Sequence, residues 1–118
     1  MIKNISKRKL NRGSTHRFAT LKNLASNLVR YEMIKTTDAK AKELKRFVEH
    51  LITRIKNSSL EANKYRIANK YLTTKSVAEK LIKIILPRYI ETKGGYTKSA
   101  IMDNRRGDNA RIVVVKFK

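Results

Sequence analysis

The chain of 118 residues contains no cysteine, which excludes a disulfide framework, cysteine-ligated zinc and thiol chemistry.

It also lacks a long apolar run. The longest, at residues 84–86 and 112–115, are far shorter than the roughly 20 residues that a membrane-spanning helix needs. No hydrophobic region follows the basic start, so we expect no secretory signal. This composition suits a reducing compartment and predicts no membrane span.

Acidic residues are missing from the first 31 positions, which hold eight lysines and arginines. Glu32 is the first carboxylate, and the whole chain has 29 basic against 9 acidic side chains, a net charge of +20. Self-repulsion of that size destabilises a compact domain on its own. The neutralising anions must therefore come from a partner, and regularly spaced phosphates of a nucleic acid are the most obvious source.

The apolar pattern divides the chain into an extended basic arm at 1–15 and a single domain at 16–118. Helical spacing of apolar residues predicts a first helix over about 16–31. Thr37 or Asp38 can cap a second helix, and a third helix follows Ser58, while Thr73 or Thr74 opens a fourth. The second helix has a clean apolar stripe: Ala41, Leu44, Val48, Leu51 and Ile55. Ser58 and Glu61 have the spacing of a capping box. Pro87 predicts the end of the fourth helix, because the residue before a proline disfavours helical backbone.

Two regions favour strands. Residues 32–36 read as one short strand, and 96–102 and 110–117 as an antiparallel hairpin. The expected fold is therefore α+β, with about four helices packed on a small mixed sheet.

Two turns carry residues that suit RNA contacts. Arg105 and Arg106 stand beside Gly107, whose freedom of φ allows close approach to a ligand, but an ordinary water-facing turn explains them equally well. After Gly94 and Gly95, Tyr96 can stack on a base or pack in the core. The residues alone favour the core for Tyr96.

Catalytic and metal-binding patterns are weak. His16 and His50 are the only histidines, and the chain has no HExxH spacing, no P-loop and no GxGxxG motif. The acidic residues are scattered rather than paired. We therefore expect no enzyme activity, no metal, no cofactor and no small-molecule substrate.

Ordered blocks of the sequence resemble one family, the bacterial large-subunit (50S) ribosomal protein seventeen family. The blocks follow the family's order over nearly the whole chain: Lys9–Arg12, Ser14–Arg17, Leu28–Glu32, Ile34–Thr37, Ala39–Leu44, Glu49–Thr53, Pro87–Tyr89, Gly94–Thr97 and Arg106–Ala110.

The resemblance implies a structural, non-catalytic protein that binds 23S-type rRNA and supports assembly of the large subunit. It also implies neighbouring ribosomal proteins near the exit-tunnel side. The expected location is a cytoplasmic ribosome, with an organellar ribosome left open. A free nucleoid or RNA-chaperone protein and a cationic membrane-surface factor are the rival interpretations.

Charge and resemblance together predict the residues that contact RNA, and the resemblance adds weight to Tyr96 and the arginine loop. The predicted set is Lys3, Lys7, Arg8, Lys9, Asn11, Arg12, Ser14, Thr15, His16, Arg17, Lys22, Arg30, Lys35, Lys40, Lys42, Tyr96, Thr97, Lys98, Arg105 and Arg106.

Overall fold

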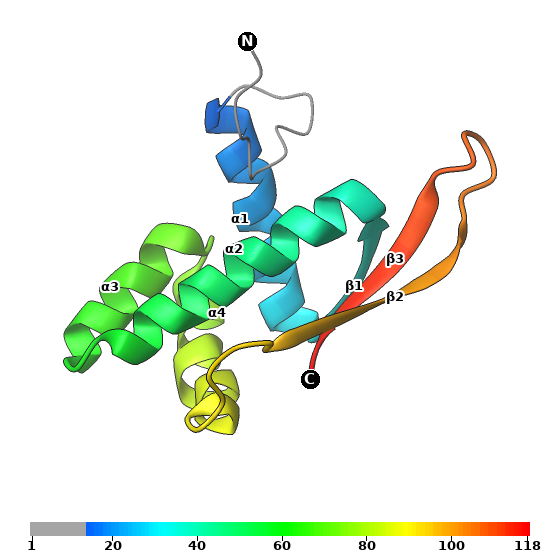
Figure 1. Ribbon diagram of the computed structural model, residues 1–118. Coiled ribbons are helices and arrows are strands. Elements are labelled where there is room, and N and C mark those ends of the chain that lie inside the picture. Colours follow the sequence, from blue (N-terminus) through cyan, green and yellow to red (C-terminus); the bar gives the residue numbers. More distant parts are fainter. Residues whose placement is uncertain (1–13) are drawn as a thin grey trace, which may run out of the picture.

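The computed structural model describes residues 14–118, and shows helices packed on one side of a small sheet (Figure 1). The chain runs through α1 (Ser14–Tyr31), β1 (Met33–Thr37), α2 (Asp38–Asn57), α3 (Glu61–Tyr71), α4 (Lys75–Lys80), β2 (Thr97–Asn104) and β3 (Arg111–Phe117). A π-helical turn (Leu81–Ile85) and a 3-10 turn (Leu86–Tyr89) continue α4. The α+β class expected from the sequence is confirmed.

The sheet has the order β1-β3-β2, with β3 in the centre. Both pairings are antiparallel, so the expectation of a mixed sheet was wrong. The hairpin sends β3 back along β2, and β1 lies antiparallel to β3 on its other edge. A bulge between Ile101 and Asp103 shifts the register near the hairpin tip.

Helix α2 lies between the sheet and the other helices (Figure 1). Its predicted apolar stripe is entirely buried, because residues three and four apart share one helical face: Ala41, Leu44, Val48, Leu51 and Ile55. Val113, Val115 and Phe117 of β3 are buried with them, at every second position of the strand. One core therefore joins the helices to one face of the sheet.

Two details at helix ends differ from the sequence prediction. Ser58 is the C-cap of α2, and its N–H donates to the Ile55 carbonyl. Helix α3 begins only at Glu61, without a side-chain cap bond, so the capping box was wrong. Thr74 does cap α4, since its hydroxyl accepts from the Val77 N–H at 3.4 Å.

The helical path also continues through Pro87, where the sequence predicted an end. In the π-helical turn, the Leu86 N–H donates to the Leu81 carbonyl, five residues back. Pro87 then stands in the first turn of the 3-10 segment, where its missing N–H is least costly. This wider turn leaves Ile85 fully buried and Ile84 52% exposed.

Candidate nucleic-acid interface

The face of the sheet turned away from the helices carries a group of exposed lysines. Cross-strand pairing places Lys98 directly opposite Lys116, and Met33 opposite Lys116 on the other edge. Lys35 follows on the same face, two residues after Met33, and all three lysines are exposed. We call Lys35, Lys98 and Lys116 the open-face lysines.

The pairing of Lys98 with Lys116 is unfavourable by itself. Like charges directly opposite on neighbouring strands destabilise a sheet. A bound anion removes that repulsion, so the arrangement is suited to a phosphate backbone. Lys116 was not in the predicted set. Its place beside Lys98 follows only from the cross-strand register, which the continuous apolar run at 112–115 does not reveal.

A second group of cations surrounds a hollow of about 240 Å³ between β1, the start of α2 and the hairpin tip. Lys35, Lys40 and Arg105 line it, together with Thr36 and Thr37. The N-terminal end of α2 adds the partial positive charge of its backbone N–H groups. Strand β1, helix α2 and the hairpin tip thus bring together cations that lie up to 70 residues apart in the sequence.

The hairpin tip positions Arg105 through a local ion pair. The Arg105 Nε and Nη2 groups donate to the two carboxylate oxygens of Asp108, at 3.1 and 2.6 Å. Asp108 also accepts from the Ala110 N–H at 3.1 Å. The hydrogen bond from Arg105, then that from Ala110, lowers the pKa of Asp108 to about 2. Asp108 therefore stays ionised and keeps Arg105 oriented at neutral pH.

Gly107 does not adopt the positive φ that its residue type permits. A Cβ added to Gly107 would meet nothing within 4 Å, and the positive φ in this loop, 58°, belongs to Asn109. Asn tolerates this left-handed backbone better than most residues. Arg106 is exposed beside it.

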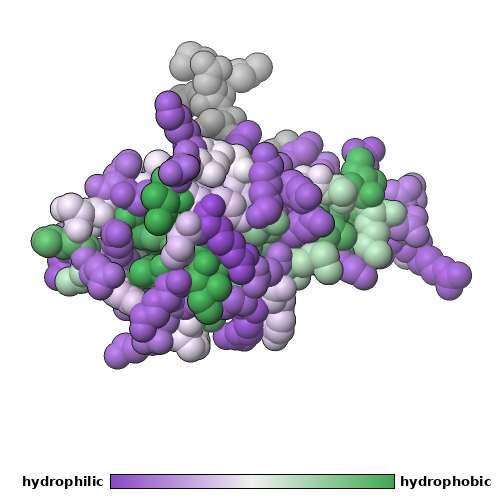
Figure 2. Space-filling model, turned by 90° about the horizontal axis from the view of Figure 1, so that it is seen from below, coloured by the Kyte–Doolittle hydropathy of each residue, from purple (hydrophilic) through white to green (hydrophobic). Residues whose placement is uncertain are grey.

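Helices α1 and α2 present further residues of the predicted set. Thr15, His16, Arg30 and Lys42 are exposed, whereas Arg17, Lys22 and Lys40 are partly buried. Lys42 pairs with Asp38 one turn earlier, at 3.4 Å. Most of the face shown in Figure 2 is hydrophilic, with hydrophobic side chains over the helices and on the projecting hairpin.

The structure corrects two members of the predicted set, Tyr96 and Thr97. Tyr96 is 1% exposed; its hydroxyl accepts from Lys56 Nζ at 3.2 Å and donates to the Thr92 carbonyl at 3.3 Å. Thr97 is 3% exposed and donates to Glu49 at 3.3 Å. Gly95, with φ of 66°, turns the chain so that Tyr96 enters the core. Neither side chain is accessible to RNA in this fold.

The remaining predicted residues cannot be placed. Lys3, Lys7, Arg8, Lys9, Asn11 and Arg12 lie outside the described residues, and the side chain of Ser14 is not described either. Within residues 14–118, no three histidine or acidic side chains gather as a metal site requires. No helix in the same part of the chain is long and apolar enough to cross a membrane.

Comparison with known proteins points to the same family as the sequence blocks. A family model described as ribosomal protein L17 matches residues 20–118. A large ribosomal subunit protein bL17 of Endomicrobium trichonymphae is 43% identical over 117 residues, covering 99% of this chain and 98% of that protein. Another of the same name, from Caldanaerobacter subterraneus subsp. tengcongensis, is 43% identical over 113 residues, or 96% of this chain and 99% of its own length. The chain belongs to the ribosomal protein L17 family.

Proposed function

We propose that this chain is a structural, non-catalytic constituent of the large ribosomal subunit that binds 23S-type rRNA through phosphate contacts. The observation that carries the proposal is the cross-strand pair Lys98–Lys116, together with Lys35 on the same open face. Family membership supports the ribosomal setting, because the relatives bear the name of large-subunit proteins.

The mechanism is electrostatic positioning rather than base reading. Cations of the open face and of the hollow around Lys40 and Arg105 contact phosphates of neighbouring RNA segments. Such contacts set the register and orientation of a protein on nucleic acid but carry little sequence information. By neutralising RNA charge between segments, the protein lowers their mutual repulsion and supports subunit assembly.

The finer setting follows from the family resemblance. We place the protein near the exit-tunnel side of the subunit, beside other large-subunit proteins, in a cytoplasmic ribosome. The basic residues of the arm at 1–15, whose last two residues begin α1, add further RNA contacts.

Sucrose-gradient sedimentation of the full chain in cell extract tests the proposal. We expect the chain to sediment with the large subunit. Recovery mainly in free fractions would instead support a nucleoid or RNA-chaperone role, and recovery with membranes would support a membrane-surface factor. Either result would overturn the ribosomal assignment.

A matched pair of variants tests the open face itself. The open-face variant carries Lys35→Gln, Lys98→Gln and Lys116→Gln. The control variant carries Arg66→Gln, Lys75→Gln and Lys83→Gln, which remove the same charge from exposed positions on the helical side. We expect the open-face variant to be lost from the large subunit at a lower salt concentration than the control. Equal loss from both would show that net charge alone, and not this face, binds RNA.

A further inference from the structure

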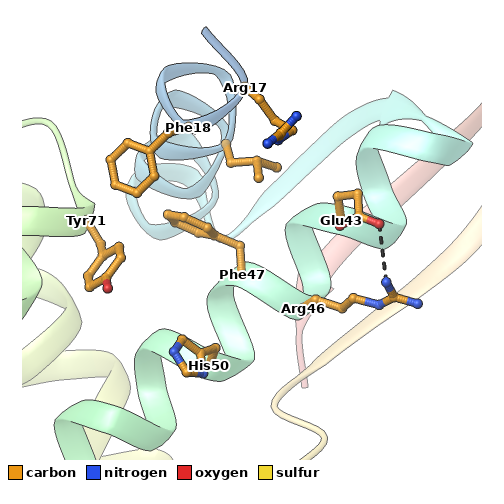
Figure 3. Close-up of a pocket in the computed structure, with 8 residues that line it drawn as sticks. Arg17, Phe18, Glu43, Arg46, Phe47, His50 and Tyr71 are labelled. Carbon is orange, nitrogen blue, oxygen red and sulfur yellow. Dashed lines mark hydrogen bonds and ion pairs between the residues drawn. The ribbon is translucent and has the colours of Figure 1, made fainter. Parts of the chain in front are cut away.

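A second hollow, of about 560 Å³, opens between α1, α2 and the end of α3 (Figure 3). Its size is within the range of roughly 300–1,000 Å³ that is usual for small-ligand sites. We call it the aromatic hollow; it is lined by Arg17, Phe18, Leu21, Glu43, Arg46, Phe47, His50 and Tyr71. Only Arg17 of these belongs to the set that charge and resemblance predicted.

Three aromatic rings from three helices meet in this hollow. The ring centroids of Phe18, Phe47 and Tyr71 lie 5.7 to 5.9 Å apart, and every pair is tilted or edge-on. Phe18 is 38% exposed, although the later residues of the same apolar stripe, Ala25 and Leu28, are fully buried. Figure 3 shows the three rings turned toward one another. The rings thus form an apolar wall that remains open at Phe18.

Cations surround the wall. Arg17 and Arg46 line the hollow beside the imidazole of His50. Behind Tyr71, the guanidinium of Arg54 lies 5.7 Å from the ring centroid and donates to the Tyr71 hydroxyl at 2.7 Å. The Lys70 ammonium is also 5.7 Å from that ring. The acidic residue of the lining, Glu43, is 3% exposed and lies 3.4 Å from Arg46.

Aromatic rings beside arginines select a ligand that is both planar and anionic. Unpaired RNA bases bind in this way, with the base stacked on a ring and the adjoining phosphates on cations. The alternative is that the three rings are only part of the hydrophobic core. In that case they would fill the space between the helices, whereas the hollow stays open and has arginines in its lining. An acidic peptide could also pair with arginines, but it has no need of three aromatic rings.

We propose that the aromatic hollow binds one unpaired base of RNA, stacked against Phe18 with its phosphates at Arg17 and Arg46. The proposal rests on the RNA-binding function proposed above. It adds a contact that depends on RNA structure, because a base held in a duplex cannot enter the hollow.

Two hairpin RNAs of the same length test this with the full chain. One carries a fluorescent adenine analogue as a single bulged base, and the other carries it within a base pair. We expect the bulged RNA to bind about tenfold more tightly, the effect of stacking one base, and its fluorescence to fall on binding. Phe18→Leu keeps an apolar side chain but lacks the ring, and should abolish the difference. Phe18→Tyr should retain it.

Leu60→Ala is the matched control, since Leu60 is 62% exposed and lies outside the hollow; it should bind both RNAs like the unaltered chain. Equal binding of the two RNAs by the unaltered chain, or a preference that survives Phe18→Leu, would overturn the base site while leaving the phosphate contacts intact. Failure to bind either RNA would instead contradict the proposed function itself.

Ultraviolet crosslinking of the unaltered chain to the bulged RNA keeps the test independent of how the variants fold. An adduct mapped by mass spectrometry to Phe18, Phe47 or Tyr71 would support the site. Adducts found only on the open face of the sheet would overturn the site. In assembled subunits, a crosslink from the hollow to an acidic segment of another protein would overturn it as well.

Discussion

The helical body and the projecting hairpin of this protein are stabilised in different ways. In the body, residues 14–89, contacts join positions far apart in the sequence, such as Arg88 and Glu32, whose side chains lie 2.5 Å apart. In the hairpin, residues 97–117, the ion pair at the tip links Arg105 to Asp108, three residues on. Strand β2 is exposed at every position after Thr97.

This difference indicates which region depends on a partner. Val113, Val115 and Phe117 of β3 share the core of the body, whereas Ile101 and Met102 in the outer part of the hairpin are more than half exposed. We therefore interpret the inner part of the hairpin as a component of the core and its outer part, residues 98–111, as the part that contacts other molecules.

The largest expected effect is on the free energy of unfolding, which should respond differently to truncations in the two regions. Leu44→Ala removes a fully buried side chain from α2 and should lower the free energy of unfolding by about 2–5 kcal/mol. Ile101→Ala, at a position 63% exposed, should change it by no more than about 0.5 kcal/mol. Urea denaturation followed by circular dichroism measures both. Similar losses from the two variants would refute the contrast between body and hairpin.

The next effect concerns RNA binding rather than folding. Each lost phosphate contact should reduce the slope of log affinity against log salt by roughly 0.7 to 0.9, so the open-face variant should lose about 2 to 3. The control variant, altered on α3, α4 and the turn after it, should keep nearly the full slope. A filter-binding titration against rRNA at several salt concentrations provides the measurement. A salt-independent affinity of the unaltered chain would refute the electrostatic mechanism.

A smaller effect is expected where the body meets the sheet, at Glu32. Its φ is 62°, a left-handed conformation that glycine adopts without strain. Glu32→Gly and Glu32→Gln both remove the carboxylate that pairs with Arg88 and Lys80. We expect the glycine variant to be the more stable, by up to about 1 kcal/mol. Thermal unfolding of the two compares them directly, and a more stable glutamine variant would contradict backbone strain at this position.

The pH dependence at Glu32 has a definite sign. The hydrogen bond from Arg88, reinforced by the charges of Arg88 and Lys80, lowers the pKa of Glu32 below its usual value. The stability that ionised Glu32 adds to the fold is therefore complete above the pKa that this residue has in the unfolded chain. That stability is lost as the pH falls through the lower pKa of Glu32 in the folded chain. Because the side chain is 37% exposed, that contribution should stay below about 1 kcal/mol. Unfolding curves of Glu32→Gln should show a weaker loss of stability in acid than the unaltered chain.

The smallest effect on global stability is expected at the hairpin tip. Asp108→Asn removes an exposed ion pair, so unfolding of the body should be unchanged within error. Hydrogen exchange at residues 105–110 should nevertheless become faster, because Asp108 holds both Arg105 and the Ala110 N–H. In the unaltered chain, an NMR titration should place the pKa of Asp108 near 2. A titration midpoint close to 4 would show that the ion pair does not form in solution.

The elements were predictable wherever local patterns controlled them. The stripe of α2 and the hairpin follow from spacing and residue type, and the structure confirms them. Of Thr73 and Thr74, which the sequence left open, Thr74 caps α4. Local rules failed where neighbouring elements overrode them. Ser58 has a capping-box spacing but ends α2, and the π-helical turn carries the chain through Pro87.

The exposed cations were predictable as a class but not one by one. Lys35, Lys98 and Arg105, which charge singled out, are exposed in the structure. Charge could not decide between core and surface for Tyr96, because a tyrosine side chain suits both environments. Lys116 required the cross-strand register, and Phe18 required the positions of α2 and α3.

The sequence by itself determined the net charge of +20, the helical stripes, the hairpin and the family. These properties depend on residue type and short spacings, which the printed chain contains in full. Only the tertiary structure decided that Tyr96 is buried, that Lys98 faces Lys116, and that three aromatic rings meet in one hollow. Each of those results requires contacts between residues distant in the chain, and such contacts form only when the helices and the sheet pack together.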